Sequence, residues 1–275
     1  MKKFFCLLSL LAVVLLTSCD EKGNNSNAGM KVYFLNVGKA DCIVAMLDDM
    51  VIMNDTGDSD CYAMIKSFLE EHEISKIDYL ILSHYDADHI ANADNLLKDF
   101  EIGQIYGPDY VRDSNHYRKL VEKAEEKGVE FTKLSCDDDD YTFENGNAMI
   151  WINVPNEETY KSDDDYSLIT SLYYDKTKVL LMGDCNKSRT IEFNNIINDT
   201  YNLIKLPHHG EYNKGEIDLV DKADNDSYYV VSTGSSDLVE TKLMTLIENN
   251  DMDVYYTYDG TICFESDGVE CSISQ

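Results

Sequence analysis

The sequence has few basic residues and no internal repeat. Lys and Arg total 23 against 52 Asp and Glu, so the formal net charge is −29 at pH 7. Proteins that follow a nucleic-acid backbone use basic patches that release counterions, and this balance therefore argues against a nucleic-acid partner. No low-complexity tract and no repeat of fixed period is present, which excludes repeat architectures. With 275 residues, 44% of them hydrophobic, the chain fits one large α/β domain.

No apolar run is long enough for a stable transmembrane helix. The N-terminal run from Phe4 to Leu16 follows Lys2 and Lys3 and is shorter than the roughly 20 residues that a membrane span needs. These features are typical of a secretory signal peptide. Its end, LTSC, resembles the lipobox of bacterial lipoproteins, which implies cleavage before Cys19 and lipidation of that thiol. An ordinary signal peptide that is cut a few residues later is the alternative.

The segment after Cys19 is polar and predicts a flexible tether over residues 20–29. We therefore divide the chain into a lipoprotein signal peptide (1–19), this tether and one folded domain (30–275). The protein is expected on the outer side of the cell membrane, held there by its lipid. Loss of the two signal-peptide lysines leaves 21 basic against 52 acidic residues, a formal charge of −31.

The cysteines do not form a CxxC pair, and a domain of this size does not need disulfides in order to fold. Cys263 and Cys271 flank an Asp-Gly sequence that predicts a hairpin turn. A disulfide between these two residues is therefore one alternative, and free thiols are the other.

Apolar periodicity predicts an alternation of strands and helices. The expected strands are 31–37, 42–47, 50–57, 77–83, 102–107, 129–134, 148–154, 167–174, 178–184, 201–210, 228–234 and 254–264, and the expected helices are 61–73, 89–100 and 115–128.

Polar side chains collect where these apolar strands end. They are Asp55, the stretch SHYDADH at 83–89, Asp184 and the pair His208–His209. Loops held by a rigid sheet are where α/β folds place their chemistry, so four such termini indicate one shared site. Imidazole and carboxylate together suit zinc, manganese or iron. The pattern therefore predicts a metal site.

Four segments carry a family resemblance. They are LNVGKAD (35–41), LILSHYDADHI (80–90), SLITSLYYDKTKVLLMGDCN (167–186) and IKLPHHG (204–210). In order and spacing they resemble the metallo-β-lactamase superfamily, and most of all its ComEC branch, a hydrolase-like domain attached or related to a DNA-uptake channel protein. The resemblance runs from Met30 to the C-terminus and implies a single-domain αββα sandwich with the site at one edge between the sheets.

The resemblance also implies a role for each side chain of the motif. His84 and Asp86 would hold a first metal, Asp88 and His89 a second, and Asp184 would bridge the two. Asp88 would also act in catalysis by orienting the nucleophile and moving its proton.

Further positions follow from the same resemblance. Either His208 or His209 would complete the second metal site, and Asp55 would fix the orientation of a ligand imidazole. Asp164 stands where the branch usually has Asn and would lie just outside the ligands. No third histidine for the first metal is evident, and Glu211 replaces the usual Ser after HHG, so the rim that meets substrate differs from the branch.

The function implied is metal-dependent hydrolysis, with one or two divalent ions, zinc or manganese, that promote deprotonation of a water. The expected substrate is a small-molecule or cell-envelope ester or phosphodiester, and the protein is expected to be a monomer. The alternatives are a ComEC-like nuclease linked to DNA uptake and a binding lipoprotein that has lost turnover. Glu211 and the acidic run Asp163–Asp165 are expected to make the local field negative, which disfavours the nuclease.

Overall fold

The structure is a computed structural model and describes residues 29–275, apart from the side chain of Asn225. The signal peptide, Cys19 and nearly all of the tether lie outside the described residues, so these calls stay predictions. Within the described part, none of the helices has the length and apolar character needed to cross a membrane.

Fifteen strands and seven α-helices make up the described part of the chain. The strands are β1 (Met30–Phe34), β2 (Ile43–Leu47), β3 (Met50–Asn54), β4 (Lys76–Ile81), β5 (Glu101–Pro108), β6 (Glu130–Leu134), β7 (Tyr141–Asn145), β8 (Ala148–Asn153), β9 (Ile169–Tyr174), β10 (Thr177–Leu181), β11 (Tyr201–Lys205), β12 (Ala223–Val231), β13 (Asp253–Tyr256), β14 (Ile262–Ser266) and β15 (Cys271–Ser274). The helices are α1 (Tyr62–Glu71), α2 (Ala87–Ile90), α3 (Ala93–Asp99), α4 (Asn115–Lys127), α5 (Lys187–Ile196), α6 (Glu216–Leu219) and α7 (Thr241–Asn249).

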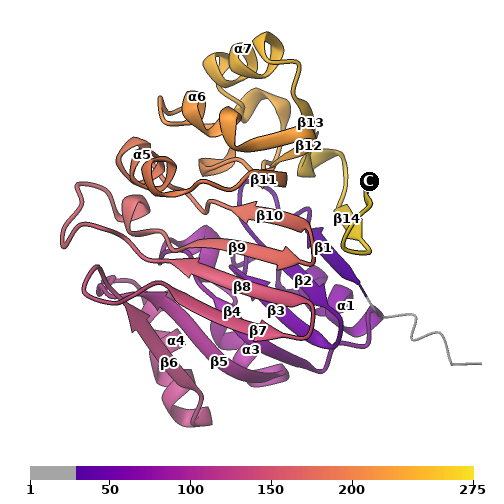
Figure 1. Ribbon diagram of the computed structural model, residues 1–275. Helices are drawn as coiled ribbons and strands as arrows, with labels where there is room; N and C mark the ends of the chain where they lie inside the picture. The colour runs from indigo at the N-terminus through magenta and orange to yellow at the C-terminus, as the bar shows by residue number, and fades with distance from the viewer. Residues whose placement is uncertain (1–28) are drawn as a thin grey trace, which may run out of the picture.

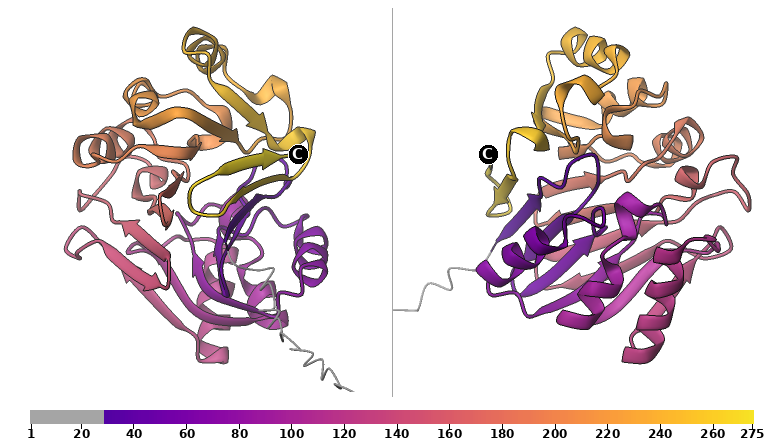
Figure 2. Two further views of the ribbon diagram at one scale, coloured as in Figure 1. Left: turned by 45° about the vertical axis from the view of Figure 1, so that its right-hand side comes forward. Right: turned by 180° about the vertical axis from the view of Figure 1, so that it is seen from behind.

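The strands form two sheets that face each other (Figure 1). The first sheet has the order β15-β14-β1-β2-β3-β4-β5-β6, and the second has the order β13-β12-β11-β10-β9-β8-β7. Helices α1, α3 and α4 bury apolar side chains against the outer face of the first sheet, and α5, α6 and α7 do so on the second. Figure 2 shows both helical layers on the outside. The expected αββα sandwich is confirmed.

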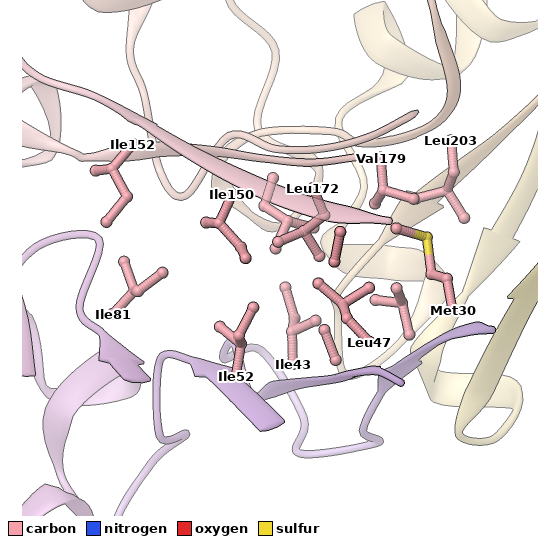
Figure 3. Close-up of a cluster of buried hydrophobic side chains, with 14 of the residues drawn as sticks. Met30, Ile43, Leu47, Ile52, Ile81, Ile150, Ile152, Leu172, Val179 and Leu203 are labelled. Atoms are coloured by element: carbon pink, nitrogen blue, oxygen red, sulfur yellow. The ribbon is translucent and has the colours of Figure 1, made fainter. Parts of the chain in front are cut away.

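The core between the sheets is built from alternate residues of the facing strands. Ile43 and Ile52 point from the first sheet toward Ile150 and Leu172 of the second (Figure 3). All four are at most 2% exposed. Burial of this apolar layer is the main force that holds the two sheets together.

Strand direction brings the predicted loops to one edge of the sandwich. Strands β3 to β6 are mutually parallel, and so are β10 to β13. Strands β2 and β9 run antiparallel to β3 and β10. The loops that precede β2 and β9 therefore lie beside the loops that follow β3 and β10, and both kinds of loop can contribute to one site.

Two of the predicted elements are wrong in extent. Residues 254–264 are not one strand, because β13 belongs to the second sheet and β14 to the first, with the 3-10 turn Thr257–Asp259 between them. The predicted helix 89–100 divides into α2 and α3 at Asn92, whose side-chain amide donates to the carbonyl oxygens of Thr56 and Asp58. Asparagine competes in this way with the helical backbone. Strands β7 and β15 and helices α5, α6 and α7 were not predicted.

The disulfide alternative is wrong. In the antiparallel pair of β14 and β15, Cys263 lies opposite Ser274, while Cys271 lies opposite Ser266. The two cysteines are therefore offset by three residues along the ladder, and each carries a free thiol. The turn forms as expected, but its register separates the two sulfurs.

Candidate metal centre

Tight backbone turns aim the functional side chains. Asp55, His208 and His209 have φ angles of 61°, 53° and 53°, the left-handed region that non-glycine residues seldom adopt. At Gly183 a Cβ atom would lie 2.8 Å from the Cβ of Ser83, so only glycine lets the loops of the two sheets come this close. Three of the seven non-glycine residues with positive φ among the described residues therefore belong to this site.

The deepest part of the centre is a buried set of imidazole and carboxylate groups. We call Asp41, His89, Asp184 and His209 the inner group; one ligand atom from each lies within 4.8 Å of the others. Asp184 Oδ2 is 3.2 Å from His89 Nε2 and 3.0 Å from His209 Nε2, and the two Nε2 atoms are 3.2 Å apart. Three potential ligand atoms therefore converge on one small volume.

Hydrogen bonds at the far side of each ring fix which nitrogen faces inward. His209 Nδ1 donates to the carbonyl oxygen of Ser232 (2.9 Å), and His89 Nδ1 donates to Asp55 Oδ2 (2.9 Å). In the neutral form of each ring the proton is on Nδ1, and both Nε2 lone pairs point at the carboxylate of Asp184. Two lone pairs and a carboxylate at this separation repel one another unless a cation, either a metal ion or a proton taken up by His89, lies between them. The donor set therefore fits a divalent metal ion.

A buried lysine supports the carboxylates of the inner group from below. Lys205 Nζ donates to Asp41 Oδ2 and to the carbonyl oxygen of Gly183 (3.1 Å), and it lies 3.8 Å from Asp184 Oδ1. Burial alone would lower the pKa of Lys205, but Asp41 and then Asp184 outweigh it and hold the pKa above its ordinary value. The lysine occupies Oδ2 of Asp41, whereas Oδ1 of Asp41 is buried without a hydrogen-bond partner among the described residues and stays available beside His89, Asp184 and His209.

A second set lies nearer the surface. We call His84, Asp86 and Asp164 the outer group, and their ligand atoms also fall within 4.8 Å of one another. Asp164 Oδ1 is 3.8 Å from His84 Nε2. Asp164 Oδ2 instead accepts hydrogen bonds from Ser162 Oγ (2.8 Å) and Asn186 Nδ2 (2.9 Å). One oxygen is thus held by the protein, and the other is left to face an ion.

The two groups adjoin through their histidines. The rings of His84 and His89 have centroids 4.1 Å apart, and Ser83 Oγ, which donates to Asp55 Oδ2 (2.7 Å), lies beside both Nδ1 atoms. Burial and then the neighbouring His89 hold the pKa of His84 well below its ordinary value. For His89, burial is outweighed by Asp184 and Asp55, which raise its pKa. His84 is therefore the neutral imidazole that a metal site requires.

Comparison with known proteins agrees with this geometry. The family model of the metallo-beta-lactamase superfamily matches residues 37–234, well over half of the chain. The chain belongs to this superfamily. It is thereby a member of a family of metal-dependent hydrolases, with a site that can hold metal.

Relatives are similar over different extents. ComE operon protein 3 of Bacillus subtilis is 26% identical over 144 residues, which is 52% of this chain and 18% of that protein. The chain thus spans less than a fifth of that relative's length. Among solved structures, the metallo-beta-lactamase fold protein YhfI of B. subtilis superposes with a TM-score of 0.57 at 15% identity, covering 86% of this chain and all of YhfI. The metallo hydrolase Igni18 of Ignicoccus hospitalis superposes with a TM-score of 0.55 at 11% identity, covering 89% of this chain and 99% of Igni18. These two likenesses show the fold.

The sequence-predicted residues of this superfamily member do not all lie at the same depth. His209 lies in the inner group, whereas His208 lies at its rim, with Nε2 3.9 Å from Asp184 Oδ2 and Nδ1 3.3 Å from Asn186 Oδ1. Asp88 is one-third exposed, and its Oδ2 is 3.6 Å from His209 Nε2. Geometry thus favours His209 over His208 as a ligand and places Asp88 at the mouth.

Two predicted roles can be compared with the contacts directly. Asp164, expected just outside the ligands, faces His84 and belongs to the outer group. This carboxylate adds a third potential ligand atom to those of His84 and Asp86. Asp184 contacts the histidines of the inner group and Lys205. Its role as a bridge to the outer group stays a prediction.

Three charged residues of the centre were missed from the sequence. Asp41 and Lys205 pair beneath the inner group, and Arg112 lies 3.0 Å from Asp86 Oδ1 in the outer group. The signal for Lys205 was present, because a lone cation inside an apolar strand needs a buried partner. Arg112 lies in the loop that follows the predicted strand 102–107, at the same sheet edge as the motif.

Two of the acidic residues that were expected to make the local field negative have ion-pair partners. Asp163 pairs with Arg112, and Glu211 pairs with Lys39 at 2.6 Å. Two cations of the chain are thus placed beside acidic side chains at the mouth. Two of the acidic residues that were expected to repel an anion are neutralised by direct ion pairs.

Proposed function

We propose that the chain is a membrane-anchored, extracytoplasmic hydrolase that cleaves a phosphodiester or a related ester. The observation that carries the proposal is the convergence of His89 Nε2, His209 Nε2 and Asp184 Oδ2, within 3.2 Å of one another, beside the outer group. Two adjacent sets of ligands at the rim of a sandwich suit ester hydrolysis, in which one centre must hold both substrate and water.

The donor sets indicate which ions would fit. The inner group offers two imidazole nitrogens and two carboxylates, and the outer group offers one nitrogen and two carboxylates. Such mixed sets suit zinc, manganese or iron, with the carboxylate-rich outer group favouring the harder ion. Ions bound there would lower the pKa of a water and polarise the ester oxygen that becomes the oxyanion.

The chain's own residues supply orientation and a proton carrier. Asp55 holds His89, and Ser162 with Asn186 holds Asp164. Asp88 is the carboxylate at the mouth that no ion pair with Lys or Arg neutralises among the described residues, and its one-third exposure lets it exchange protons with solvent. We infer that Asp88 accepts the proton of the attacking water and later delivers it to the leaving group.

Membrane attachment is supported by the sequence LTSC and by the polar segment 20–29, which would let the domain stand clear of the lipid surface. Mass spectrometry of the mature protein tests this part of the proposal. A lipid on Cys19, lost in Cys19→Ala, is the expected result, and an unmodified Cys19 would contradict it.

A second candidate function is nuclease activity, favoured by the similarity to ComE operon protein 3. A formal charge of −31 for the mature chain weighs against a long polyanion, because ions at the scissile bond neutralise only the nearest phosphates. Each of the two groups contains at least three potential metal ligands. This weakens the alternative of a binding protein without turnover, because loss of activity would be expected to go with loss of ligands.

The test is a hydrolysis screen after reconstitution with zinc or manganese, over phosphodiester, phosphomonoester, lactone, carboxyl ester and single-stranded DNA substrates. We expect turnover of a small ester that exceeds turnover of DNA at 150 mM salt, an ionic strength near the physiological one. Asp88→Asn should lower turnover by roughly 10²–10⁴-fold. The metal content of this variant tells a proton carrier from the metal ligand that the resemblance also implies. No turnover of any ester by the metal-loaded wild type would contradict the proposal.

A further inference from the structure

The proposed hydrolysis leaves one cation at the centre unexplained. Arg112 Nη1 lies 3.0 Å from Asp86 Oδ1 and also donates to Asp163 Oδ2. Since Asp86 belongs to the outer group, the guanidinium is one carboxylate away from the place where an ion would be held. The side chain is 35% exposed and therefore also faces the solvent from which a substrate arrives.

The loop that carries Arg112 is anchored on both sides. Before it, the ring of Tyr110 stacks on Tyr166 with centroids 4.8 Å apart, and the Tyr110 hydroxyl accepts a hydrogen bond from the backbone N–H of Tyr85 (2.9 Å). After it, Ser114 caps the first turn of α4. The arginine is thus pre-positioned, and binding a ligand there costs little conformational freedom.

Most of the donors of Arg112 are free to bind. A guanidinium has five N–H donors in one plane. Within residues 29–275 both carboxylate partners engage Nη1, and neither Nε nor Nη2 has a hydrogen-bond partner. The open edge with Nε and Nη2 is the one that grips two oxygens of a phosphoryl group in a bidentate manner.

We propose that Arg112 binds a phosphoryl oxygen of the substrate and makes the centre select anionic phosphoesters over neutral esters. The inference rests on the proposed function and deepens it, because it names the substrate class. Arg112 acts as a specificity-determining residue that holds the non-reacting oxygen, while the outer group holds the reacting end.

A competing explanation is that Arg112 only braces its loop through Asp163. The two roles differ in what happens when Asp163 is changed. Asp163→Asn removes the outer partner of the arginine but leaves the guanidinium in place. If Arg112 only braces the loop, Asp163→Asn removes the bracing ion pair and should have the same effect as Arg112→Gln. If Arg112 binds substrate, Asp163→Asn removes an anion that competes with the substrate for the guanidinium.

The experiment compares bis(4-nitrophenyl) phosphate, an anionic diester, with 4-nitrophenyl acetate, a neutral ester, on the metal-loaded full-length protein. Arg112→Gln should raise KM for the diester about 10- to 100-fold, the worth of a charge-assisted hydrogen bond. It should leave kcat/KM for the acetate within about threefold, because a neutral ester makes no use of the charge. Arg112→Lys should fall between, and Asp163→Asn should not raise KM for the diester.

Arg118→Gln is the matched control. Arg118 is another ion-paired arginine of the same region: it lies on α4, and its Nη1 is 2.8 Å from Asp113 Oδ1. Its loss should change the kinetic constants of neither substrate. Metal content and circular dichroism of every variant show whether the fold and the ions are retained. If Arg112→Gln does not fold, Arg112→Lys and Asp163→Asn still separate the two roles.

A titration with inorganic phosphate separates failure of this inference from failure of the proposed function. If neither ester is hydrolysed but phosphate binds the wild type at least tenfold more tightly than Arg112→Gln, the function fails and the role of Arg112 stands. Equal losses on both esters in Arg112→Gln and Asp163→Asn would overturn the inference, as would phosphate affinity that is unchanged or undetectable in both proteins.

Discussion

The inner and outer groups use the same side-chain types but differ in what stands behind them. Every ligand of the inner group has a buried partner: Asp55 behind His89, the Ser232 carbonyl behind His209 and Lys205 beside Asp184. In the outer group His84 is buried, but the side chains of Asp86 and Asp164 are 32% and 18% exposed. The inner group is built to hold an ion, and the outer group is built to hold an ion that a substrate can reach.

The cations show the same division. Lys205 is fully buried under the inner group, where its charge offsets the carboxylates permanently. Arg112 is at the rim of the outer group, where a substrate can compete for it. Depth thus decides whether a positive charge serves stability or recognition, since Coulomb interactions are strongest away from water.

The largest expected effect is on the buried lysine. Lys205→Met would leave Asp41 and Asp184 buried without their cation, and we expect a loss of about 3–5 kcal/mol in the free energy of unfolding. Urea denaturation of metal-free protein measures it. Lys178→Met is the control, because Lys178 pairs with Asp199 at the surface and should cost less than about 1 kcal/mol. Equal losses would show that the inner group does not depend on its internal cation.

The next effect tests whether the inner group depends more on its support than the outer group does. Asp55→Asn weakens the hydrogen bond that orients His89 and should lower affinity for zinc about 10- to 100-fold. Asn186→Ala removes one of the two hydrogen-bond donors to Asp164 and should lower the affinity for zinc only a few-fold. Competition with a zinc chelator measures both. A larger effect of Asn186→Ala would reverse the comparison.

A third prediction concerns a buried carboxylate that has no cation. Burial raises the pKa of Glu216 to about 8, and its Oε2 accepts only a backbone hydrogen bond from Asn213. The contribution of protonated Glu216 to the free energy of unfolding is fully present below pH 4.5, the ordinary pKa of glutamate. It is lost as pH rises toward 8, because Glu216 ionises at a lower pH in the unfolded chain than in the folded one. Glu216→Gln should therefore gain about 4 kcal/mol over the wild type at pH 8 and nothing at pH 4.

Thermal unfolding across this pH range checks the third prediction. The control is Glu70→Gln, at an exposed position of α1, which should follow the wild type at every pH. If Glu216→Gln and the wild type keep a constant difference from pH 4 to pH 8, the carboxyl is not held protonated by burial. That result would contradict the contrast between Asp41, which has the buried cation Lys205 beside it, and Glu216, which has no cation beside it among the described residues.

The sequence was sufficient for the layers and for most of the centre, because apolar strands and the polar residues after them are both local patterns. His84 and His89 follow the predicted strand 77–83, and Asp184 and His209 lie at the ends of the predicted strands 178–184 and 201–210. All four lie together in the structure. Their convergence depends on the strands being parallel, and that is what an alternation of strands and helices predicts.

What was missed depends on strand direction. Asp41, which was not predicted, and Asp164, which was predicted just outside the ligands, precede β2 and β9. These two strands run antiparallel to β3 and β10, so both carboxylates come to the same edge from the opposite end of a strand. No local pattern shows which strands are reversed. The pairing of Lys205 with Asp41 spans 164 residues, and the contact of Arg112 with Asp86 depends on two neighbouring loops of the first sheet. Such contacts follow from the fold and are not visible before it.

The central claim is that two adjacent groups each hold one metal ion, and calorimetric titration of metal-free protein with zinc tests it most directly. The wild type should bind two equivalents. His209→Ala and Asp164→Ala should each retain one, and His208→Ala, the neighbour at the rim, should retain two. Two equivalents in all three variants, or none in the wild type, would contradict the account.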